Sequence, residues 1–136
     1  MNNGTIKVFG GTQKRPNIHI ADMTDLYIKS LELPDEAIDG KTYNAGYENH
    51  TLMEIAEAVR RAVGSHVDIV TTPTDDLRSY HISSERIRQE LGFEPKHSIE
   101  DAVRDLAAAF NAGLIPDSFT DSRYFNIKKM QLVSLK

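Results

Sequence analysis

The sequence predicts an α/β fold in which short strands alternate with helices. Short stretches of alternating or β-branched residues, such as residues 5–9 and 67–71, are typical of strands. Segments with apolar residues at helical spacing lie between and after them. Capping and terminating residues flank most of these helical segments. Alternation of strands and helices along one chain indicates α/β architecture.

Residues 5–9 are expected to form the first strand, because polar and apolar side chains alternate up to a pair of glycines. Residues 15–20 are expected to be extended as well, since Pro16 disfavours helix in the residue before it. A helix then opens at Asp22 and ends before Pro34. Its apolar residues fall on one face: Met23, Leu26, Tyr27 and Leu31.

Residues 42–46 are predicted to form a short strand that ends in glycine. No adjacent partner for this strand is evident in the chain, so we expect it to belong to a larger sheet. The helix that follows is the clearest element, because Thr51 and Glu54 form a capping box and Gly64 ends it. Its apolar stripe consists of Leu52, Ile55, Ala56, Val59 and Val63.

The second half of the chain is predicted to contain a strand and two helices. Residues 67–71 form the strand, residues 72–76 a loop, and residues 80–82 a short extended piece. Ser83 or Ser84 caps a short helix that Gly92 ends.

Ser98 and Asp101 open the last predicted helix, which ends at Gly113. Its apolar residues are expected to face a core: Ile99, Ala102, Val103, Leu106 and Phe110. Residues 117–136 lack periodicity, so a surface tail or a packing arm is expected there.

Composition excludes several classes of protein. The 136 residues are 40% hydrophobic and 26% charged, which is typical of one globular domain. Sixteen basic against twenty acidic residues give a net charge of −4, which argues against binding nucleic acid but permits an anionic small ligand. No apolar run has the length of a membrane span, and the amino end lacks a signal-peptide core. Without cysteine the chain has no disulfide or thiolate metal site, and a cytoplasmic location is expected.

The sequence gives little support for catalytic or metal-binding residues. The five histidines form no i,i+4 pair and no His-Glu-x-x-His pattern, so no metal site is predicted. Tyr124 and Lys128 have the Tyr-x-x-x-Lys spacing of a short-chain dehydrogenase, in which the lysine lowers the tyrosine pKa. We interpret this pair as a coincidence, because it lies in the aperiodic tail and no nucleotide fold precedes it.

Two arginines are the candidates for binding a ligand. Arg15 precedes an extended segment, and Arg78 follows the loop at residues 72–76. A diphosphate requires permanently charged donors in a forked geometry, which arginine supplies better than lysine. In the alternative, each arginine is a surface residue paired with Asp22 or Asp76, worth under about 1 kcal/mol. Spacing alone favours that alternative.

The segment Arg-Pro-Asn-Ile-His-Ile-Ala-Asp at residues 15–22 resembles the Arg-x-x-Ile/Phe-His-Val-x-Asp segment of extended short-chain dehydrogenases. These are nucleotide-sugar epimerases, dehydratases and their relatives. Residues 42–46 resemble the family's Tyr-Asn-x-Gly strand, and residues 76–95 resemble its Arg-x-Tyr stretch with a downstream Leu-Gly-x-x-Pro. Residues 98–103 are similar to its closing helix. The matches occur in family order and span about residues 4–113.

The resemblance implies the carboxy-terminal, substrate-side part of a Rossmann-type epimerase, with residues 1–116 as the substrate-binding portion and 117–136 as a tail or packing arm. It implies that Arg15 contacts a nucleotide diphosphate, that Asp76 contacts the ribose, and that Arg78 lies in the same loop. The implied ligand is a nucleotide-diphosphate sugar. A phosphate-binding arginine of the family is replaced here by Pro73, and Ser83 and Arg86 replace a common aspartate and lysine.

In the family the glycine-rich NAD or NADP loop and the catalytic tyrosine–lysine pair precede this region. The chain is therefore expected to lack an amino-terminal Rossmann half, to contain no catalytic or cofactor-binding residue, and to be inactive and cofactor-free alone. Apolar surface meant for that half predicts self-association. A non-catalytic nucleotide-binding module and an inactive fragment are the alternative interpretations.

Overall fold

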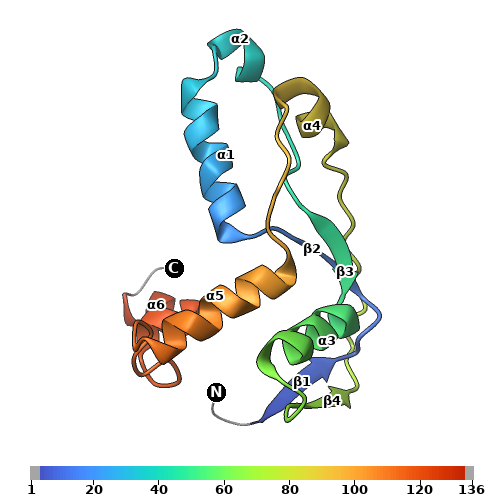
Figure 1. The fold of residues 1–136 in the computed structure, drawn as a ribbon, viewed down its shortest axis with the longest axis vertical. Coiled ribbons are helices and arrows are strands. Elements are labelled where there is room, and N and C mark those ends of the chain that lie inside the picture. Colours follow the sequence, from blue (N-terminus) through green and yellow to red (C-terminus); the bar gives the residue numbers. More distant parts are fainter. Residues whose placement is uncertain (1–3, 134–136) are drawn as a thin grey trace. The chain divides into compact units, whose positions relative to one another are not determined.

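The computed structural model describes residues 4–133, which fall into two compact units. The first extends to Asp105 and the second begins at Leu106. The first unit contains two small sheets, and one helix, α3 (Leu52–Val63), lies beside them. Three further helices lie at the other end of the unit, namely α1 (Ile20–Glu32), α2 (Asp35–Ile38) and α4 (Glu85–Leu91) (Figure 1).

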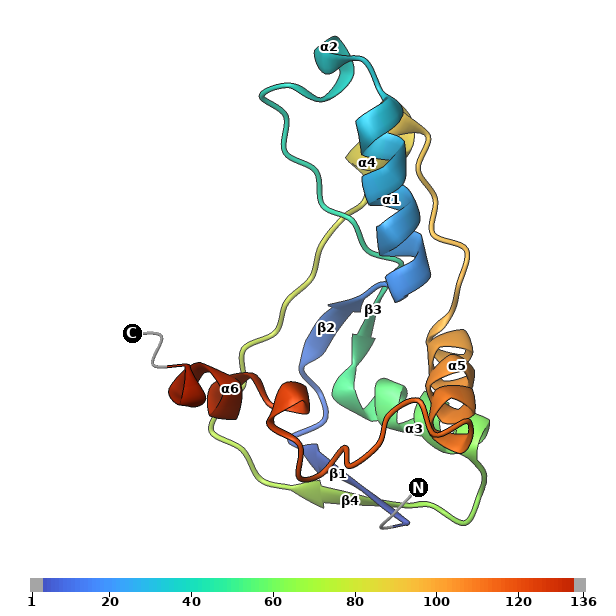
Figure 2. The same cartoon turned by 90° about the vertical axis from the view of Figure 1, so that its left-hand side faces the viewer.

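Each sheet joins an early segment of the chain to a later one. Strand β1 (Thr5–Phe9) pairs in parallel with β4 (Asp68–Thr72). Strand β2 (Lys14–Asn17) pairs antiparallel with β3 (Glu48–Thr51). Because a parallel pair needs a crossover connection, the helix α3 (Leu52–Val63) lies between β3 and β4 in the chain and packs on β1 and β4 (Figure 2). The predicted strands at residues 5–9 and 67–71 are confirmed, the latter shifted by one residue.

Helix α1 (Ile20–Glu32) begins two residues earlier than the sequence predicts. The cause is His19, whose Nδ1 accepts a hydrogen bond of 3.1 Å from the backbone N–H of Ala21 and so caps the helix. Asp22 therefore lies inside the first turn, where a carboxylate is favourable. A single-turn helix that the sequence analysis missed, α2 (Asp35–Ile38), follows Pro34.

The predicted caps of α3 and α5 (Ile99–Asn111) are confirmed, whereas Ser84 at the start of α4 makes no side-chain cap bond and Ser83 Oγ accepts the Glu85 N–H at 3.3 Å. In α3, Thr51 Oγ1 accepts the Glu54 N–H at 3.1 Å, and Glu54 Oε2 accepts the Thr51 N–H at 2.7 Å. Helix α4 (Glu85–Leu91) ends at Gly92, whose φ of 58° is left-handed. Helix α5 follows Ser98.

The predicted strand at residues 42–46 is wrong. These residues have no regular structure, and the N–H of Gly46 donates to the hydroxyl of Ser84 instead of to a strand. Pairing with β2 begins one residue later, where the N–H of Tyr47 donates to the carbonyl of Asn17. Residues 80–82, predicted to be extended, belong to no strand: the N–H of Tyr80 donates to the carbonyl of Lys14, and the side chain of Asn49 bonds both backbone groups of Ile82.

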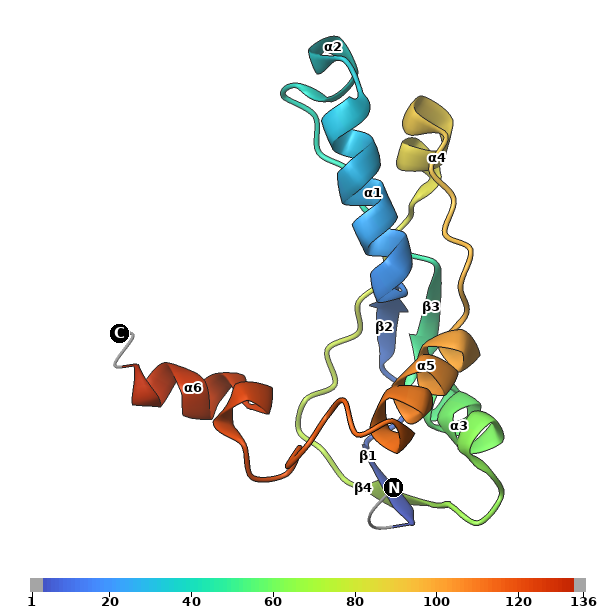
Figure 3. The same cartoon turned by 60° about the vertical axis from the view of Figure 1, so that its left-hand side comes forward.

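A small apolar core joins α1 to α4, which lie side by side (Figure 3). Leu26 of α1 packs with Ile87, Leu91 and Phe93. The predicted apolar face of α1 is wider than this core. Tyr27 and Leu31 are 65% and 86% exposed, so of the predicted face only Leu26 is buried.

The apolar face predicted for α5 is only partly buried, because Ile99, Ala102 and Val103 are half-buried. No residue of α5 is fully buried, and Leu106 and Phe110 are 52% and 39% exposed. Beyond α5 the segment predicted to be aperiodic contains a 3₁₀ turn, η1 (Ser122–Tyr124), and a helix, α6 (Asn126–Leu132). The last three residues of the predicted tail lie outside the described range. The functional division at residue 116 stays a prediction.

Candidate functional site

The fold brings Arg15 and Arg78 together, although they lie 63 residues apart in the chain. Arg15 Nη1 donates to the carbonyl of Arg78 at 2.7 Å and to that of Lys14 at 2.9 Å. Beside this contact, the N–H of Tyr80 donates to the carbonyl of Lys14 at 3.0 Å, and the N–H of Lys14 donates to the hydroxyl of Ser79. The loop that follows β4 is thereby fastened along β2.

The guanidinium of Arg15 is held but not saturated. Its Cζ lies 5.1 Å from the centroid of the Tyr80 ring, a distance that permits a cation–π interaction. Within residues 4–133, Nε and Nη2 of Arg15 have no hydrogen-bond partner, because both of its bonds use Nη1. Two of its donor groups therefore remain available to an anion.

Asp76 and Arg78 form a closed pair. Arg78 donates from Nε to Oδ1 and from Nη2 to Oδ2 of Asp76, each at 2.8 Å, and its backbone N–H adds a third bond of 3.2 Å. The hydrogen bonds from Arg78 hold the pKa of Asp76 far below its usual range, and the charge of Arg15 contributes to this. The same pairing raises the pKa of Arg78. The alternative pairing of Arg78 with Asp76 is thus realised, while Arg15 does not pair with Asp22.

A second Asp-x-Arg pair shows that this arrangement does not by itself indicate a ligand site. Arg123 donates from Nε to Asp121 Oδ2 at 2.8 Å and from its backbone N–H to Oδ1 at 2.9 Å. What distinguishes the loop at Asp76 is the additional arginine, Arg15, which the fold holds beside it.

Gln13 is a buried residue of this region that the sequence analysis missed. It is 4% exposed, and its side-chain amide forms hydrogen bonds with the N–H of Gly11 and with the carbonyls of Phe9 and Asp76. A glutamine in a turn has no spacing or periodicity that would single it out, so only its contacts indicate its role.

His19 and Asp22 lie at the junction between β2 and α1. Their hydrogen bonds involve neither Arg15 nor Arg78. Asp22 is 2% exposed and accepts two hydrogen bonds from His97, from the backbone N–H at 3.0 Å and from Nδ1 at 2.8 Å. Burial raises the pKa of Asp22, but the bonds from His97 outweigh burial and lower it. The hydrogen bond with Asp22 raises the pKa of His97. The rings of His19 and His97 stack at 4.7 Å, so the cluster fixes the helix start.

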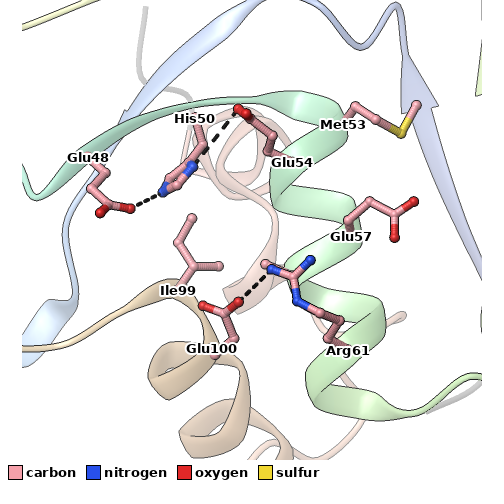
Figure 4. A pocket seen from close by; sticks show the side chains of 9 residues that line it. Glu48, His50, Met53, Glu54, Glu57, Arg61, Ile99 and Glu100 are labelled. Carbon is pink, nitrogen blue, oxygen red and sulfur yellow. Dashed lines mark hydrogen bonds and ion pairs between the residues drawn. The ribbon is translucent and has the colours of Figure 1, made fainter.

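A hollow of about 450 Å³ lies between α3 and the start of α5 (Figure 4). Four of its lining residues are glutamates, and Glu48 and Glu54 flank His50 while Arg61 pairs with Glu100 at 2.7 Å. None of the predicted site residues lines it. Its carboxylates repel phosphate, so this hollow does not suit a diphosphate.

Tyr124 and Lys128, the pair with the spacing of a short-chain dehydrogenase, each lie next to another residue. Lys128 Nζ lies 4.2 Å from the centroid of the Phe125 ring, and Arg123 lies over Tyr124. No group of three or more potential metal ligands gathers among the residues that the structure describes. Nor does any helix there combine the length and apolar character needed to cross a membrane.

No family model matches the chain. In sequence it is similar to UDP-glucose 4-epimerase 2 of Arabidopsis thaliana, with 33% identity over 104 residues, which covers 74% of this chain and 30% of the relative. It is also similar to the UDP-glucose 4-epimerase of Corynebacterium glutamicum, with 29% identity over 107 residues, covering 76% of this chain and 32% of the relative. The chain thus spans less than a third of the length of these relatives.

The fold is that of part of several solved enzymes. L-threonine dehydrogenase from Phytophthora infestans matches with a TM-score of 0.70 and 14% identity, over 82% of this chain and 38% of that one. UDP-glucose 4-epimerase from Thermotoga maritima, with UDP-glucose, matches with a TM-score of 0.67 and 21% identity, over 81% and 36%. dTDP-glucose 4,6-dehydratase from Bacillus anthracis, in complex with NAD, matches with a TM-score of 0.65 and 20% identity, over 86% of this chain and 38% of that one. The predicted α/β class and partial Rossmann-type fold are confirmed.

The predicted resemblance is confirmed as well: the relatives of this chain in sequence are UDP-glucose 4-epimerases, and its neighbours in structure include NAD-dependent epimerases and dehydratases of the extended short-chain dehydrogenase family, of which the chain covers a part.

Proposed function

We propose that this chain is the carboxy-terminal, substrate-side portion of an NAD(P)-dependent nucleotide-sugar epimerase or dehydratase, and that it binds the nucleotide diphosphate through Arg15. Asp76 and Arg78 complete the site. The observation that carries the proposal is the position of Arg15, whose guanidinium is fixed on the Asp76–Arg78 loop while two of its donor groups stay unpaired within the described residues.

A fixed guanidinium with unpaired donors suits a diphosphate. Arginine binds phosphate oxygens through parallel N–H bonds, and a pre-oriented side chain loses little rotamer freedom on binding. Arg15 is oriented by two carbonyls and by the ring of Tyr80 before any ligand is present. Its site therefore gives the affinity for the diphosphate, and the acidic hollow at Glu48 and Glu100 contributes none.

Asp76 is proposed to accept a hydrogen bond from a ribose hydroxyl. A carboxylate has about four acceptor positions, and Arg78 uses three of them in this structure. One position is left for a hydroxyl. The very low pKa of Asp76 keeps it ionised, and therefore an acceptor, at neutral pH.

NAD or NADP is assigned to the part of the parent protein outside this chain, and hydride transfer belongs to that part. Support comes from the short span of the relatives that the chain covers, and from the apolar residues exposed on α1, which suit contact with an amino-terminal Rossmann half. This segment holds the sugar nucleotide in place, which favours the reaction by fixing the geometry of the reactants. A cytoplasmic location stays a prediction from the sequence.

The test is a titration of the ¹⁵N-labelled chain with UDP and with uridine, followed by NMR up to millimolar ligand. We expect the amide signals of Arg15 and of residues 76–80 to move with UDP. Arg15→Ala is expected to weaken UDP binding by roughly tenfold to a hundredfold and to leave uridine binding nearly unchanged. Asp76→Ala is expected to weaken both ligands.

Arg123→Ala is the matched control. Arg123 forms the same kind of Asp-x-Arg pair, with Asp121, but that pair is not bonded to a second arginine as Arg78 is to Arg15. It should leave UDP affinity unchanged. If UDP moves only signals around Glu48 and Glu100, or if Arg15→Ala binds UDP as the wild type does, the proposed site is wrong.

The isolated chain is expected to bind neither NAD nor NADP tightly and to turn over no UDP-, dTDP- or GDP-sugar. The physical reason is that its described loops contain no phosphate-cradling turn of the glycine-rich type and that Lys128 lies over Phe125. Cofactor binding is measured by fluorescence titration, and turnover by separation of the sugar nucleotides. Turnover that Tyr124→Phe abolishes would identify the tyrosine–lysine pair as a true active site.

A further inference from the structure

Gln13 lies in the turn between β1 and β2, where its side chain is surrounded by backbone groups. Oε1 accepts the N–H of Gly11 at 2.7 Å, and Nε2 donates to the carbonyl of Phe9 at 3.1 Å. These two bonds close the turn. A third bond leaves it: Nε2 donates to the carbonyl of Asp76 at 2.9 Å, across 63 residues of sequence.

The turn is shaped to receive this amide. Gly10 has a φ of +78°, a conformation that favours glycine. A Cβ at that position would lie 2.5 and 2.7 Å from the Nε2 and Oε1 atoms of Gln13. The turn therefore accommodates the glutamine side chain only because residue 10 has none.

The bond to Asp76 fixes the candidate site from the inside. Arg15 and Lys14 fasten the same loop from the outside, at Arg78 and Tyr80. Gln13 is the most deeply buried of these side chains, with 4% of its surface exposed. A backbone held there determines where the carboxylate of Asp76 stands relative to Arg15.

We propose that Gln13 is the positioning residue of the diphosphate site: it holds the backbone of Asp76 against the turn before β2, so that Asp76 and Arg78 meet the ligand that Arg15 binds. Gln13 does not contact the ligand, since both donors of its amide are engaged within the protein. The inference rests on the function proposed for Arg15, Asp76 and Arg78.

Gln13→Glu tests the role of the donor, because it preserves size and one oxygen but replaces Nε2 by a second oxygen. At pH 7.5 that oxygen faces the carbonyls of Phe9 and Asp76 without a proton to share, and the loop is released. At pH 5.5 the buried carboxyl, whose pKa burial raises, is protonated and donates to Asp76 again. We expect UDP affinity about tenfold below wild type at pH 7.5, and recovery to within about threefold at pH 5.5.

The wild type, titrated with UDP at both pH values, corrects for protonation of the ligand. Gln13→Leu has no donor at any pH, so its UDP affinity should be low at both. If Arg15→Ala weakens UDP while Gln13→Glu binds it like the wild type at both pH values, Gln13 has no positioning role, although the proposed function stands. Weak binding by a folded Gln13→Glu at both pH values also overturns the role. A wild type that binds no UDP removes the proposed function itself.

A measurement on the wild-type chain covers the case in which these variants fail to fold. The two Nε2 protons of Gln13 should exchange slowly with solvent, and their exchange should slow further when UDP fixes the Asp76 loop. An exchange rate like that of an exposed glutamine such as Gln89, with or without UDP, contradicts the proposal.

Discussion

The side chain of Asp22 is charged and almost fully buried, and it ties the start of α1 to the segment before α5. Both of its oxygens accept hydrogen bonds from His97. His97 itself is partly open to solvent, with 39% of its side chain exposed. The contribution of this pair to the stability of the first unit therefore depends on pH.

His97 limits the stabilising pH range from above, and Asp22 limits it from below. The pKa of His97 is raised by Asp22, so the contribution of its charge is complete below the ordinary histidine pKa of about 6.5 and is lost as the pH rises through the raised value. The pKa of Asp22 is lowered by His97 in spite of burial, so its contribution is present above about pH 3.9 and is lost as the pH falls through the lowered value. The pair stabilises most between about pH 4 and pH 6.5.

We expect the difference in urea midpoint between the wild type and His97→Gln to be largest near pH 5.5 and to narrow toward pH 9. Unfolding is followed by circular dichroism at a series of pH values. His81→Gln is the control, because His81 is an exposed histidine. A difference that does not change with pH would mean that the backbone N–H of residue 97, not the charge, holds Asp22.

Ile87 illustrates how much one apolar residue contributes to a small core. It is 2% exposed and packs with Leu26, Leu91 and Phe93. We expect Ile87→Ala to lower the free energy of unfolding by about 2–5 kcal/mol, through lost transfer energy and the cavity left behind. Ile20→Ala makes the same chemical change at a residue that is 75% exposed, and it should cost under about 1 kcal/mol. Equal losses in urea titration would contradict this core.

Among the elements, those specified by neighbouring residues follow the sequence closely. Thr51 and Glu54 define the start of α3, and Ser98 and Asp101 define that of α5, because each capping pair bonds within four residues. The segment at residues 42–46 differs, since its predicted strand depended on a distant partner. Ser84 supplies the bond to Gly46 from 38 residues away, and no local pattern announces it.

In the candidate site, too, the residues could be named from the sequence, whereas the contacts between distant segments could not. Arg15 and Asp76 lie in segments whose residue order resembles a known family, so both could be predicted. The contact between Arg15 and the carbonyl of Arg78, and the bond from Gln13 to Asp76, each span 63 residues and required the fold. The missed cap at His19 has another cause, because histidine is not a preferred capping residue.

The capping box of α3 gives a prediction at this scale. Thr51→Ala removes the acceptor for the Glu54 N–H and should destabilise the first unit by about 1 kcal/mol. Thr51→Ser retains the hydroxyl and should lose far less. Both are compared by thermal unfolding. Equal melting temperatures for Thr51→Ala and the wild type would show that β3, and not the cap, determines where the helix begins.

At the scale of the whole molecule, the chain exposes more apolar surface on α1 than its own core uses. Four large side chains on neighbouring turns are each more than half exposed: Ile20, Tyr27, Ile28 and Leu31. Such a face normally marks contact with another protein surface. Among the described residues of the first unit, none covers this face of α1.

We expect the isolated chain to self-associate as its concentration rises, and we expect the double change Tyr27→Lys with Leu31→Glu to suppress this. Sedimentation velocity over a range of concentrations measures both. Leu77→Glu is the control, because Leu77 is 71% exposed but lies away from α1 in the chain. A wild type that sediments as a compact monomer at every concentration, with no dye-binding apolar surface, contradicts the prediction.

The pairing of β1 with β4 has a consequence for how the chain acquires its structure. The bonds from Gln13 to Asp76, from Lys29 to Leu91 and from His97 to Asp22 bridge 63, 62 and 75 residues. Contacts of such separation close late, after local helices have formed, because loop closure costs entropy that only the completed contacts repay. During synthesis β2 thus remains unpaired until β3, which ends at Thr51, has emerged, and β1 until β4, which ends at Thr72, has emerged. For that interval their open edges are exposed to pairing with other chains.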